Sequence, residues 1–277
     1  MEHEAPLIYK YLRSHKKFPS IWCPGCGNGA ALGAIIRAVD RLGLAKDDVA
    51  MVSGIGCAGR MPVYVDFNTL HTTHGRALAF ATGIKLAKPQ MTVLVVMGDG
   101  DALAIGGNHF IHAARRNIDL KAIIVNNSTY GLTSGQASPT TPLGSITSTS
   151  AYGSLEQPFD VAKLAEAAGA VFVARGTVYH ILELDHLIEK AIVKKGFSVV
   201  EVISNCHVNF GKMNNMPTAT QMLKWQRDQT IAVAVATARG DSGGKILRGV
   251  LVDRDRPEYC EEYRRLVERL QQGASAE

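Results

Sequence analysis

The chain has 277 residues, of which 46% are hydrophobic and 20% are charged, and its formal net charge at pH 7 is +5. This composition is typical of an ordinary soluble globular protein with enough chain for a sizeable core. No stretch of about 18 apolar residues could form a transmembrane helix, and the charged N-terminal segment lacks the apolar core of a signal peptide. We therefore expect a cytoplasmic protein that binds neither membrane nor nucleic acid, since the modest charge indicates only weak attraction to acidic partners.

The first half of the chain alternates predicted helices and strands. Residues 1–20 form a basic lead-in that includes Lys16 and Lys17. Apolar spacing then predicts a helix over 30–42, a strand over 49–52, a helix over 77–86, a strand over 93–97, a helix over 102–116 and a strand over 121–125. The last two strands are continuous apolar runs, as in strands buried on both faces of a parallel sheet.

Polar residues follow these two strands where each one ends. Gly98-Asp99-Gly100 is predicted to turn the chain sharply, because glycine tolerates positive φ and close backbone approach, and Asn127 follows the next strand. Open α/β sheets bind ligands at the carboxyl ends of parallel strands, so we expect Asp99 and Asn127 to lie in one site. Their oxygens suit Mg²⁺. The helix N-terminus after Gly100 offers free N–H groups to a diphosphate.

The second half begins with a long segment, 131–153, that is rich in Ser, Thr, Pro and Gly. Loops of this length are usually functional or disordered, and we expect an active-site loop. Further predicted elements are a helix over 160–168, a strand over 171–174, a helix over 178–194, a strand over 197–203 and a charged final helix over 257–271. The alternation predicts a doubly wound, mostly parallel α/β sheet in one domain, 21–210, with a less regular C-terminal extension, 211–277.

Four of the five cysteines lie at predicted loops that could converge at one end of the sheet. Cys23 and Cys26 form a C-x-x-C loop, Cys57 lies in a glycine-rich turn, and Cys206 follows the last strand. Spacing alone allows a [4Fe–4S] cluster, a structural Zn²⁺ site, or a redox dithiol with the other two cysteines buried as hydrophobic residues. Cys260, in the charged final helix, is expected to be unligated.

Gly98-Asp99-Gly100, followed after 26 residues by Asn127, resembles the motif of thiamine-diphosphate enzymes. Each half alone is also compatible with an ordinary turn. The resemblance implies a thiamine-diphosphate-binding (diphosphate-domain) fold in which Asp99, Asn127 and the main-chain carbonyl of Thr129 bind Mg²⁺. The residues expected to bind the cofactor are Gly56, Cys57, His74, Gly98, Asp99, Gly100, Asp101, Asn127 and Thr129.

Four motifs, at 22–27, 54–57, 74–77 and 98–133, resemble in order the β subunit of the 2-oxoacid:ferredoxin oxidoreductases, and the likeness covers about residues 20–215. It implies that Cys23, Cys26, Cys57 and Cys206 ligate one [4Fe–4S] cluster beside the thiamine diphosphate. It also implies oxidative decarboxylation of a 2-oxoacid to acyl-CoA and CO₂, with electrons passing through the cluster to ferredoxin. We expect 2-oxoglutarate as the substrate, with pyruvate second, and a reaction that a low-potential electron donor could reverse.

The chain contains no second domain for the aminopyrimidine of the cofactor, so the resemblance implies a separate α subunit that carries it. His74 and Arg76 are candidate catalytic residues, ahead of His71, because they could contact the diphosphate or a substrate carboxylate. Helix capping is the alternative role. Ser134 stands where many relatives have a lysine, which puts a lysine-based substrate contact in doubt.

The basic lead-in could steer an acidic ferredoxin towards Cys23, although a solvated charged face would look the same. Two other functions fit parts of the pattern. A non-oxidative thiamine-dependent 2-oxoacid decarboxylase would leave the four cysteines without a role, and bound iron would distinguish it. A zinc-stapled binding subunit would contain zinc without iron.

Overall fold

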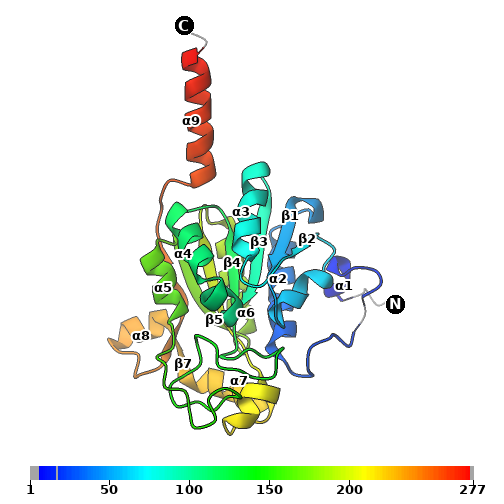
Figure 1. Ribbon diagram of the computed structural model, residues 1–277, viewed down its shortest axis with the longest axis vertical. Helices are drawn as coiled ribbons and strands as arrows, with labels where there is room; N and C mark the ends of the chain where they lie inside the picture. Colours follow the sequence, from blue (N-terminus) through cyan, green and yellow to red (C-terminus); the bar gives the residue numbers. More distant parts are fainter. Residues whose placement is uncertain (1–5, 17, 275–277) are drawn as a thin grey trace.

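An eight-stranded sheet in the order β2-β1-β3-β4-β6-β5-β8-β7 forms the centre of the computed structural model, which describes residues 6–16 and 18–274 (Figure 1). The strands are β1 (Val49–Ser53), β2 (Asn68–His71), β3 (Thr92–Gly98), β4 (Lys121–Asn126), β5 (Phe172–Thr177), β6 (Ser198–Ile203), β7 (Thr230–Ala232) and β8 (Ile246–Asp253). All pairs from β2 to β5 are parallel, and β8 runs antiparallel to β5.

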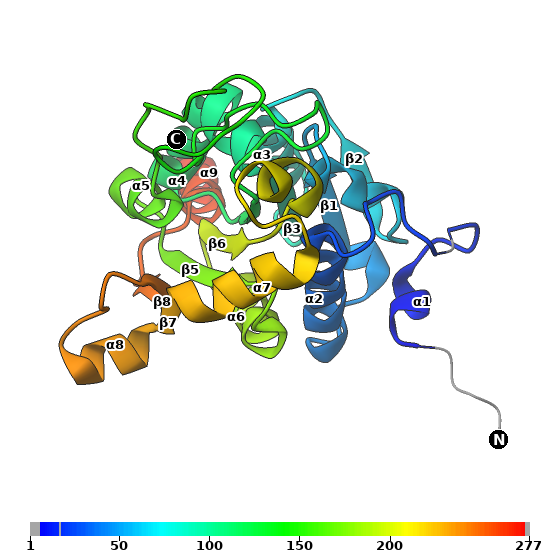
Figure 2. The same ribbon diagram turned by 90° about the horizontal axis from the view of Figure 1, so that it is seen from below.

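Helices cover both faces of this sheet, which confirms the doubly wound α/β prediction (Figure 2). On one face lie α2 (Gly27–Arg41) and α6 (Ile181–Val193); on the other lie α3 (Ala77–Ala87), α4 (Gly107–Arg116) and α5 (Val161–Ala168). Every residue of β1, β5 and β6 is buried, as expected for strands that lie between two helical layers.

The connections reverse direction between β1 and β3. From β1 the chain crosses to the edge strand β2, whereas from β3 it crosses to the opposite neighbour, β4. Loops that leave in opposite directions open a crevice at the carboxyl ends of the two strands, where open α/β sheets bind ligands. The register aligns these ends, with Ser53 beside Val96 and Gly98 beside Val125.

The helix predicted over 102–116 is divided. It starts with a π-helical turn, η3 (Asp101–Ile105), and continues as α4 only from Gly107. At the junction, a Cβ on Gly106 would lie 2.3 Å from the Asp101 carbonyl oxygen, so only glycine fits there. A π turn inside a helix often marks a functional site, and this one follows the Gly-Asp-Gly turn.

The C-terminal segment is more regular than its sequence indicates. It adds α7 (Ala219–Gln229) and α8 (Val233–Arg239), and it contributes β7 and β8 to the central sheet. The helix predicted over 257–271 is present as α9 (Tyr259–Ala274). Shorter helical elements that the sequence did not reveal are α1 (Ile8–Tyr11), η1 (Lys46–Asp48), η2 (Ala58–Val63) and η4 (His207–Gly211). Within 6–16 and 18–274, no helix combines the length and the apolar character needed to cross a membrane.

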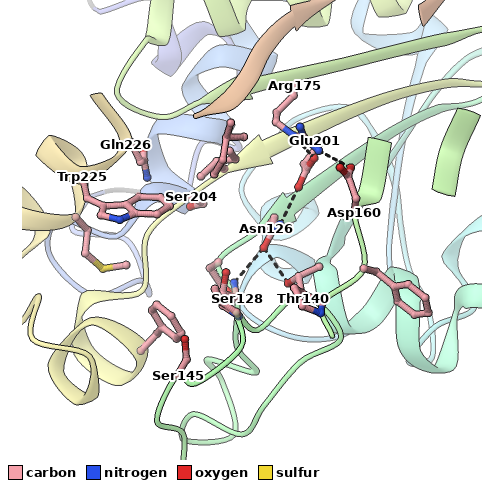
Figure 3. Close-up of a pocket in the computed structure, with 18 of the residues that line it drawn as sticks. Asn126, Ser128, Thr140, Ser145, Asp160, Arg175, Glu201, Ser204, Trp225 and Gln226 are labelled. Atoms are coloured by element: carbon pink, nitrogen blue, oxygen red, sulfur yellow. Dashed lines mark hydrogen bonds and ion pairs between the residues drawn. The ribbon is translucent and has the colours of Figure 1, made fainter. Parts of the chain in front are cut away.

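A buried ionic network supports the carboxyl end of β4 (Figure 3). Arg175 Nε donates to Glu201 Oε2 at 2.6 Å, and Arg175 Nη2 donates to Asp160 Oδ1 at 2.6 Å. The other Glu201 oxygen accepts from Asn126 Nδ2 at 2.7 Å. Since Asn126 immediately precedes Asn127, the network fixes the turn that carries a predicted Mg²⁺ ligand.

We predict that Glu201→Ala lowers the free energy of unfolding by about 3 kcal/mol, because it leaves the buried Arg175 guanidinium only partly paired. Denaturant unfolding of the chain measures this effect. The control Glu156→Ala removes an exposed carboxylate and should change stability by less than about 0.5 kcal/mol. Equal effects of the two substitutions would show that the network does not stabilise the fold.

Candidate active site

Asp99 lies at the carboxyl end of β3 and is 2% exposed. Its Oδ2 accepts hydrogen bonds from Ser138 Oγ at 2.6 Å and from Thr140 Oγ1 at 2.5 Å. Burial raises the pKa of Asp99 to about 6, and these hydroxyls only partly offset that effect. No lysine or arginine pairs with Asp99 among the described residues, so the carboxylate has the surroundings of a cation ligand rather than of an ion pair.

The turn after β4 faces Asp99. Ser128 has a positive φ of 60°, and Asn127 Oδ1 accepts from the Thr129 main-chain N–H at 3.3 Å. Thr129 Oγ1 and the Tyr130 N–H both donate to the Gln136 carbonyl, which returns the long loop towards the sheet. Ser138 and Thr140 belong to this loop, so the predicted active-site loop contacts the site directly.

A cavity of about 130 Å³ lies between these turns and the glycine-rich turn after β1. It is lined by every residue that the sequence predicts to bind the thiamine cofactor: Gly56, Cys57, His74, Gly98, Asp99, Gly100, Asp101, Asn127 and Thr129. The structure therefore brings the whole predicted set together at the crevice between β1 and β3. We call this cavity the thiamine cavity.

His74 is held in the thiamine cavity by Asp101. Its Nδ1 lies 2.5 Å from Asp101 Oδ1, which also accepts from the main-chain N–H of Gly75 at 2.7 Å and of Ile55 at 3.2 Å. Burial is the main cause of the raised pKa of Asp101. Its other oxygen, Oδ2, is buried without a hydrogen-bond partner in the described part of the chain. Asp101 thus fixes the orientation of His74 and retains one free acceptor.

Two other candidates lie elsewhere. The Arg76 guanidinium donates to the Ile105 carbonyl at 3.0 Å, and Arg76 does not line the thiamine cavity. His71 Nδ1 lies 2.9 Å from Ser53 Oγ, and this exposed residue does not line the cavity either. Of the three basic residues singled out from the sequence, only His74 reaches the cavity.

In the Gly-Asp-Gly turn, close packing and not a positive φ accounts for Gly100, whereas a Cβ on Gly98 would meet no atom within 4 Å. Neither Gly98 nor Gly100 has a positive φ, so that part of the prediction is wrong. A Cβ on Gly100 would lie 2.2 Å from a Tyr130 ring carbon, and Tyr130 Oη donates to the Gly100 carbonyl at 3.3 Å. Gly100 is required because the Tyr130 ring packs directly on its backbone.

The four predicted cluster cysteines line a second cavity, of about 220 Å³, which we call the cysteine cavity. Cys23 is exposed, and Cys26, Cys57 and Cys206 are partly buried. Burial raises the pKa of Cys57 to about 11, and the neighbouring thiols add to this effect. Asn28 Nδ2 donates to Cys26 Sγ at 3.3 Å, a contact of the kind that tunes cysteine-bound clusters.

Gly131 separates the two cavities. A Cβ on Gly131 would lie 3.4 Å from Cys206 Sγ, 3.6 Å from Asn127 Nδ2 and 3.8 Å from Cys57 Sγ. Gly131 and Cys57 line both cavities. The thiamine cavity and the cysteine cavity are therefore adjacent, and Asn127 and Leu132 also line both of them.

Each cavity contains ligand atoms of the kind that its expected group needs: oxygen atoms for Mg²⁺ in the thiamine cavity and sulfur atoms for a [4Fe–4S] cluster in the cysteine cavity. Asp99 is a buried carboxylate without a cationic partner, as a Mg²⁺ site requires, and Asn127 and the Thr129 carbonyl lie on the facing turn. In the cysteine cavity four thiols surround one space. Among the described residues, no three His, Cys, Asp or Glu side chains are arranged to hold one metal ion. In a four-iron cluster, however, each cysteine binds a different iron, so its sulfurs lie farther apart.

A larger cavity, of about 630 Å³, opens beside the buried Arg175 network (Figure 3). Trp225, Phe159 and Phe210 line it together with polar residues such as Ser145 and Ser204. It shares Asn127 with the thiamine cavity. The Arg175 charge is already neutralised by Glu201 and Asp160, so this guanidinium is not available to an anionic ligand.

Comparisons with known proteins identify the family. Residues 54–202 match the thiamine pyrophosphate enzyme C-terminal TPP binding domain. The chain is 48% identical to 2-oxoglutarate synthase subunit KorB of Methanothermobacter marburgensis over 96% of this chain and 93% of that protein. It is 61% identical to the KorB subunit of Archaeoglobus fulgidus over 71% and 73% of the two chains. The chain belongs to the β subunits of the 2-oxoacid:ferredoxin oxidoreductases.

A solved structure of the family has the same fold. The 2-oxoglutarate:ferredoxin oxidoreductase from Magnetococcus marinus, with 2-oxoglutarate, coenzyme A and succinyl-CoA bound, superposes with a TM-score of 0.85 and 33% identity, covering 98% of this chain and 92% of that one. The family assignment, the oxidoreductase class and the thiamine-diphosphate-binding fold predicted from the sequence are thus confirmed. As a β subunit, the chain functions with a partner subunit.

Sequence reasoning missed Ser138, Thr140 and Tyr130 as parts of the site. The two hydroxyl residues bind Asp99 from 39 and 41 positions away, and Tyr130 packs on Gly100. The concentration of Ser and Thr directly after Asn127 was the available signal. This signal predicted a functional loop, but it could not show which hydroxyl groups would contact Asp99.

We predict that Gly100→Ala destabilises the chain by about 1–3 kcal/mol, because the new methyl group must displace the Tyr130 ring. Thermal unfolding measures the effect. Gly107→Ala, nearby in α4, meets no atom within 4 Å and should be neutral or slightly stabilising, since alanine favours helix. A Gly100→Ala chain as stable as this control would contradict the packing argument.

Proposed function

We propose that the chain is the β subunit of an enzyme that catalyses 2-oxoglutarate + CoA + 2 oxidised ferredoxin ⇌ succinyl-CoA + CO₂ + 2 reduced ferredoxin + H⁺. The observation that carries this proposal is the adjacency of the thiamine cavity and the cysteine cavity across Gly131. The names of relatives that match over more than nine tenths of both chains support 2-oxoglutarate as the substrate. Pyruvate is the second candidate.

In the proposed site, Asp99, Asn127 and the Thr129 carbonyl hold Mg²⁺, and the glycine-rich turns at Gly56 and Gly100 bind the diphosphate. When bound, thiamine diphosphate supplies an electron sink for the charge that decarboxylation leaves on the substrate. Ser138 and Thr140 orient the Asp99 carboxylate, and the long loop that carries them shields the site from water. The chain thus contributes positioning and electrostatics, not a nucleophile of its own.

His74 is the proposed catalytic residue of this chain. Its Nδ1 faces Asp101, and its Nε2 makes no hydrogen bond within the described part of the chain, so we propose that Nε2 contacts the diphosphate or the substrate in the cavity. For Arg76 we propose a positioning role, since its hydrogen bond to the Ile105 carbonyl stabilises the junction of η3 and α4.

Cys23, Cys26, Cys57 and Cys206 are the proposed ligands of one [4Fe–4S] cluster, which supplies a one-electron acceptor beside the cofactor. Cys57 lies nearest the thiamine cavity, and the exposed Cys23 lies on the outer side. In this arrangement, electrons would enter the cluster on the side of Cys57 and leave it on the side of Cys23. A non-oxidative decarboxylase would need no such arrangement, so the cysteine cavity favours the oxidoreductase.

The partner subunit is proposed to bind the aminopyrimidine and much of the substrate. No lysine or arginine lines the thiamine cavity within the described ranges, Arg175 is already paired, and Ser134 supplies no charge. Lys163 and Lys245 line the larger cavity, which shares Asn127 with the thiamine cavity, so the second carboxylate of 2-oxoglutarate could meet one of these lysines or a cation of the partner subunit. We expect much of the selectivity between 2-oxoglutarate and pyruvate to reside in the partner subunit.

The complex of this chain with its partner subunit, purified without oxygen, should reduce a viologen dye when given CoA and 2-oxoglutarate. We expect a rate with pyruvate at least tenfold lower. Comparable rates would move the substrate assignment to pyruvate or to a broad 2-oxoacid range. Absence of reduction with any 2-oxoacid, in a complex without iron, would support the non-oxidative decarboxylase.

Cys206→Ala should abolish bound iron and sulfide and the visible absorption of the cluster, because one of the four ligands is lost. Cys260 is buried at the far C-terminal helix and lines neither cavity, so Cys260→Ala serves as the matched control and should retain full iron. Iron content and absorption are measured on the purified complex before any assay. Full iron in Cys206→Ala would rule out this ligand set.

Lys16 is proposed to help steer ferredoxin. Its Nζ lies 5.9 Å from the centre of the Tyr64 ring, which packs at 5.1 Å on Trp22, and Trp22 Nε1 donates to the Cys57 carbonyl. Lys16 therefore belongs to the layer that covers the cysteine cavity. Lys17, its predicted companion, lies outside the described residues.

We predict that Lys16→Gln lowers the rate of ferredoxin reduction about threefold at low ionic strength. Reduction of a small dye should be unchanged, because a dye needs no protein docking. The difference should disappear at high salt, where surface charges are screened. An equal rate with ferredoxin at low salt would show that Lys16 has no steering role.

A further inference from the structure

Asn28 carries a buried amide in the first turn of α2, directly beside the cysteine cavity. This side chain is 1% exposed, it lines the cavity, and its Nδ2 donates to Cys26 Sγ at 3.3 Å. Among the described residues, no other side chain donates a hydrogen bond to a sulfur of the four cavity cysteines. Asn28 therefore makes a distinctive contact with one of the proposed cluster ligands.

The stability of the fold does not explain this amide. Asn28 Oδ1 is buried and has no hydrogen-bond partner in the described part of the chain, and an unpartnered buried acceptor destabilises a folded protein. A leucine has the same branched shape without the polar atoms, and it also favours helix more than asparagine does. A buried polar group that lacks a partner needs an explanation outside folding, and a redox role is one.

Close packing at the start of α2 holds the donor in place. A Cβ on Gly27 would lie 2.2 Å from Ser204 Oγ, so α2 begins in close contact with the segment that leads to Cys206. On that segment, Asn205 Nδ2 donates to the Gly25 carbonyl at 2.9 Å. The C-x-x-C loop is thus attached to the end of β6, and the Asn28 side chain extends from a fixed helix.

A hydrogen bond to a ligand sulfur affects the two redox states of a cluster differently. A cysteine that binds iron carries negative charge, and this charge increases when the cluster gains an electron. The hydrogen bond is therefore stronger in the reduced state, which raises the reduction potential. A thiolate accepts hydrogen bonds and donates none, so the amide of Asn28 can present only its N–H to Cys26.

We propose that Asn28 is a positioning residue that acts through Cys26: its hydrogen bond to the sulfur raises the reduction potential of the cluster, which then accepts electrons from the thiamine site more readily. This inference rests on the proposed function, because it requires a cluster that is bound by the four cavity cysteines. It does not depend on which 2-oxoacid is the substrate.

The reduction potential tests the proposal on the anaerobic complex of this chain with its partner subunit. Electron paramagnetic resonance follows the reduced cluster during a titration with redox mediators, and the signal that Cys206→Ala removes belongs to this chain. In Asn28→Leu with full iron, we expect the ratio of reduced to oxidised cluster at a fixed potential to fall about tenfold. For a one-electron couple this is a shift of about 59 mV to a more negative potential.

Two further variants separate the hydrogen bond from the packing. Asn205→Leu is the matched control, because it removes a buried asparagine that holds the same loop but contacts no sulfur, and it should leave the potential unchanged. Asn28→His should keep the ratio within about threefold of the wild type at alkaline pH, where the imidazole is neutral. Its Nδ1 is attached at the same branch point as Nδ2 of asparagine and can donate in its place.

A wild-type potential in Asn28→Leu with full iron would overturn the proposal and leave the cluster assignment intact. An equal shift in Asn205→Leu would also overturn it, by showing that a distorted loop changes the potential. If Asn28→Leu does not retain iron, Asn28→Ala removes the same donor without adding bulk, and loss of iron from both would show that Asn28 serves cluster assembly instead. A wild-type complex without iron would contradict the proposed function itself and this inference with it.

Discussion

A buried carboxylate without a cation beside it is the constraint on which the site depends. Asp99 is excluded from solvent at the end of β3, and its carboxylate accepts hydrogen bonds from the hydroxyls of Ser138 and Thr140 and from the main chain. Such a group costs free energy in the folded chain unless it is protonated or meets a positive charge. The long loop after β4, the position of Asn127 and the network behind Asn126 all serve to maintain this arrangement. In the proposed holoenzyme, Mg²⁺ supplies the charge.

The position of the cysteine cavity follows from the same sheet. Cys57 follows β1, and Cys206 follows β6, so parallel strands bring both to the edge that holds Asp99. Gly131, at the start of the active-site loop, lines both cavities, and a Cβ there would lie at ordinary van der Waals distance from Cys206 Sγ and Asn127 Nδ2. The loop that contacts Asp99 through its hydroxyl groups therefore also borders the cysteine cavity.

The sequence predicted the site well where local pattern and strand order decide geometry. Buried apolar runs identified β3 and β4, and turns at the ends of parallel strands must share one edge, so Asp99, Asn127 and Cys57 could be placed together. Contacts made by segments without helix or strand could not be predicted in this way. Ser138 and Thr140 reach Asp99 through a loop without periodicity, and Arg76 turns to the Ile105 carbonyl instead of the cavity. The antiparallel addition of β8 depends on tertiary pairing that its own sequence does not reveal.

Electron transfer from the thiamine site to a cluster on this same chain is the central claim, and one measurement tests it most directly. The anaerobic complex, loaded with thiamine diphosphate and Mg²⁺, is mixed with 2-oxoglutarate in the absence of CoA and ferredoxin, frozen, and analysed by electron paramagnetic resonance. We expect the signal of a reduced [4Fe–4S] cluster that requires Cys57 and Cys206 and accompanies release of CO₂. Release of CO₂ with every cluster still oxidised, or from a complex without iron, would contradict this claim.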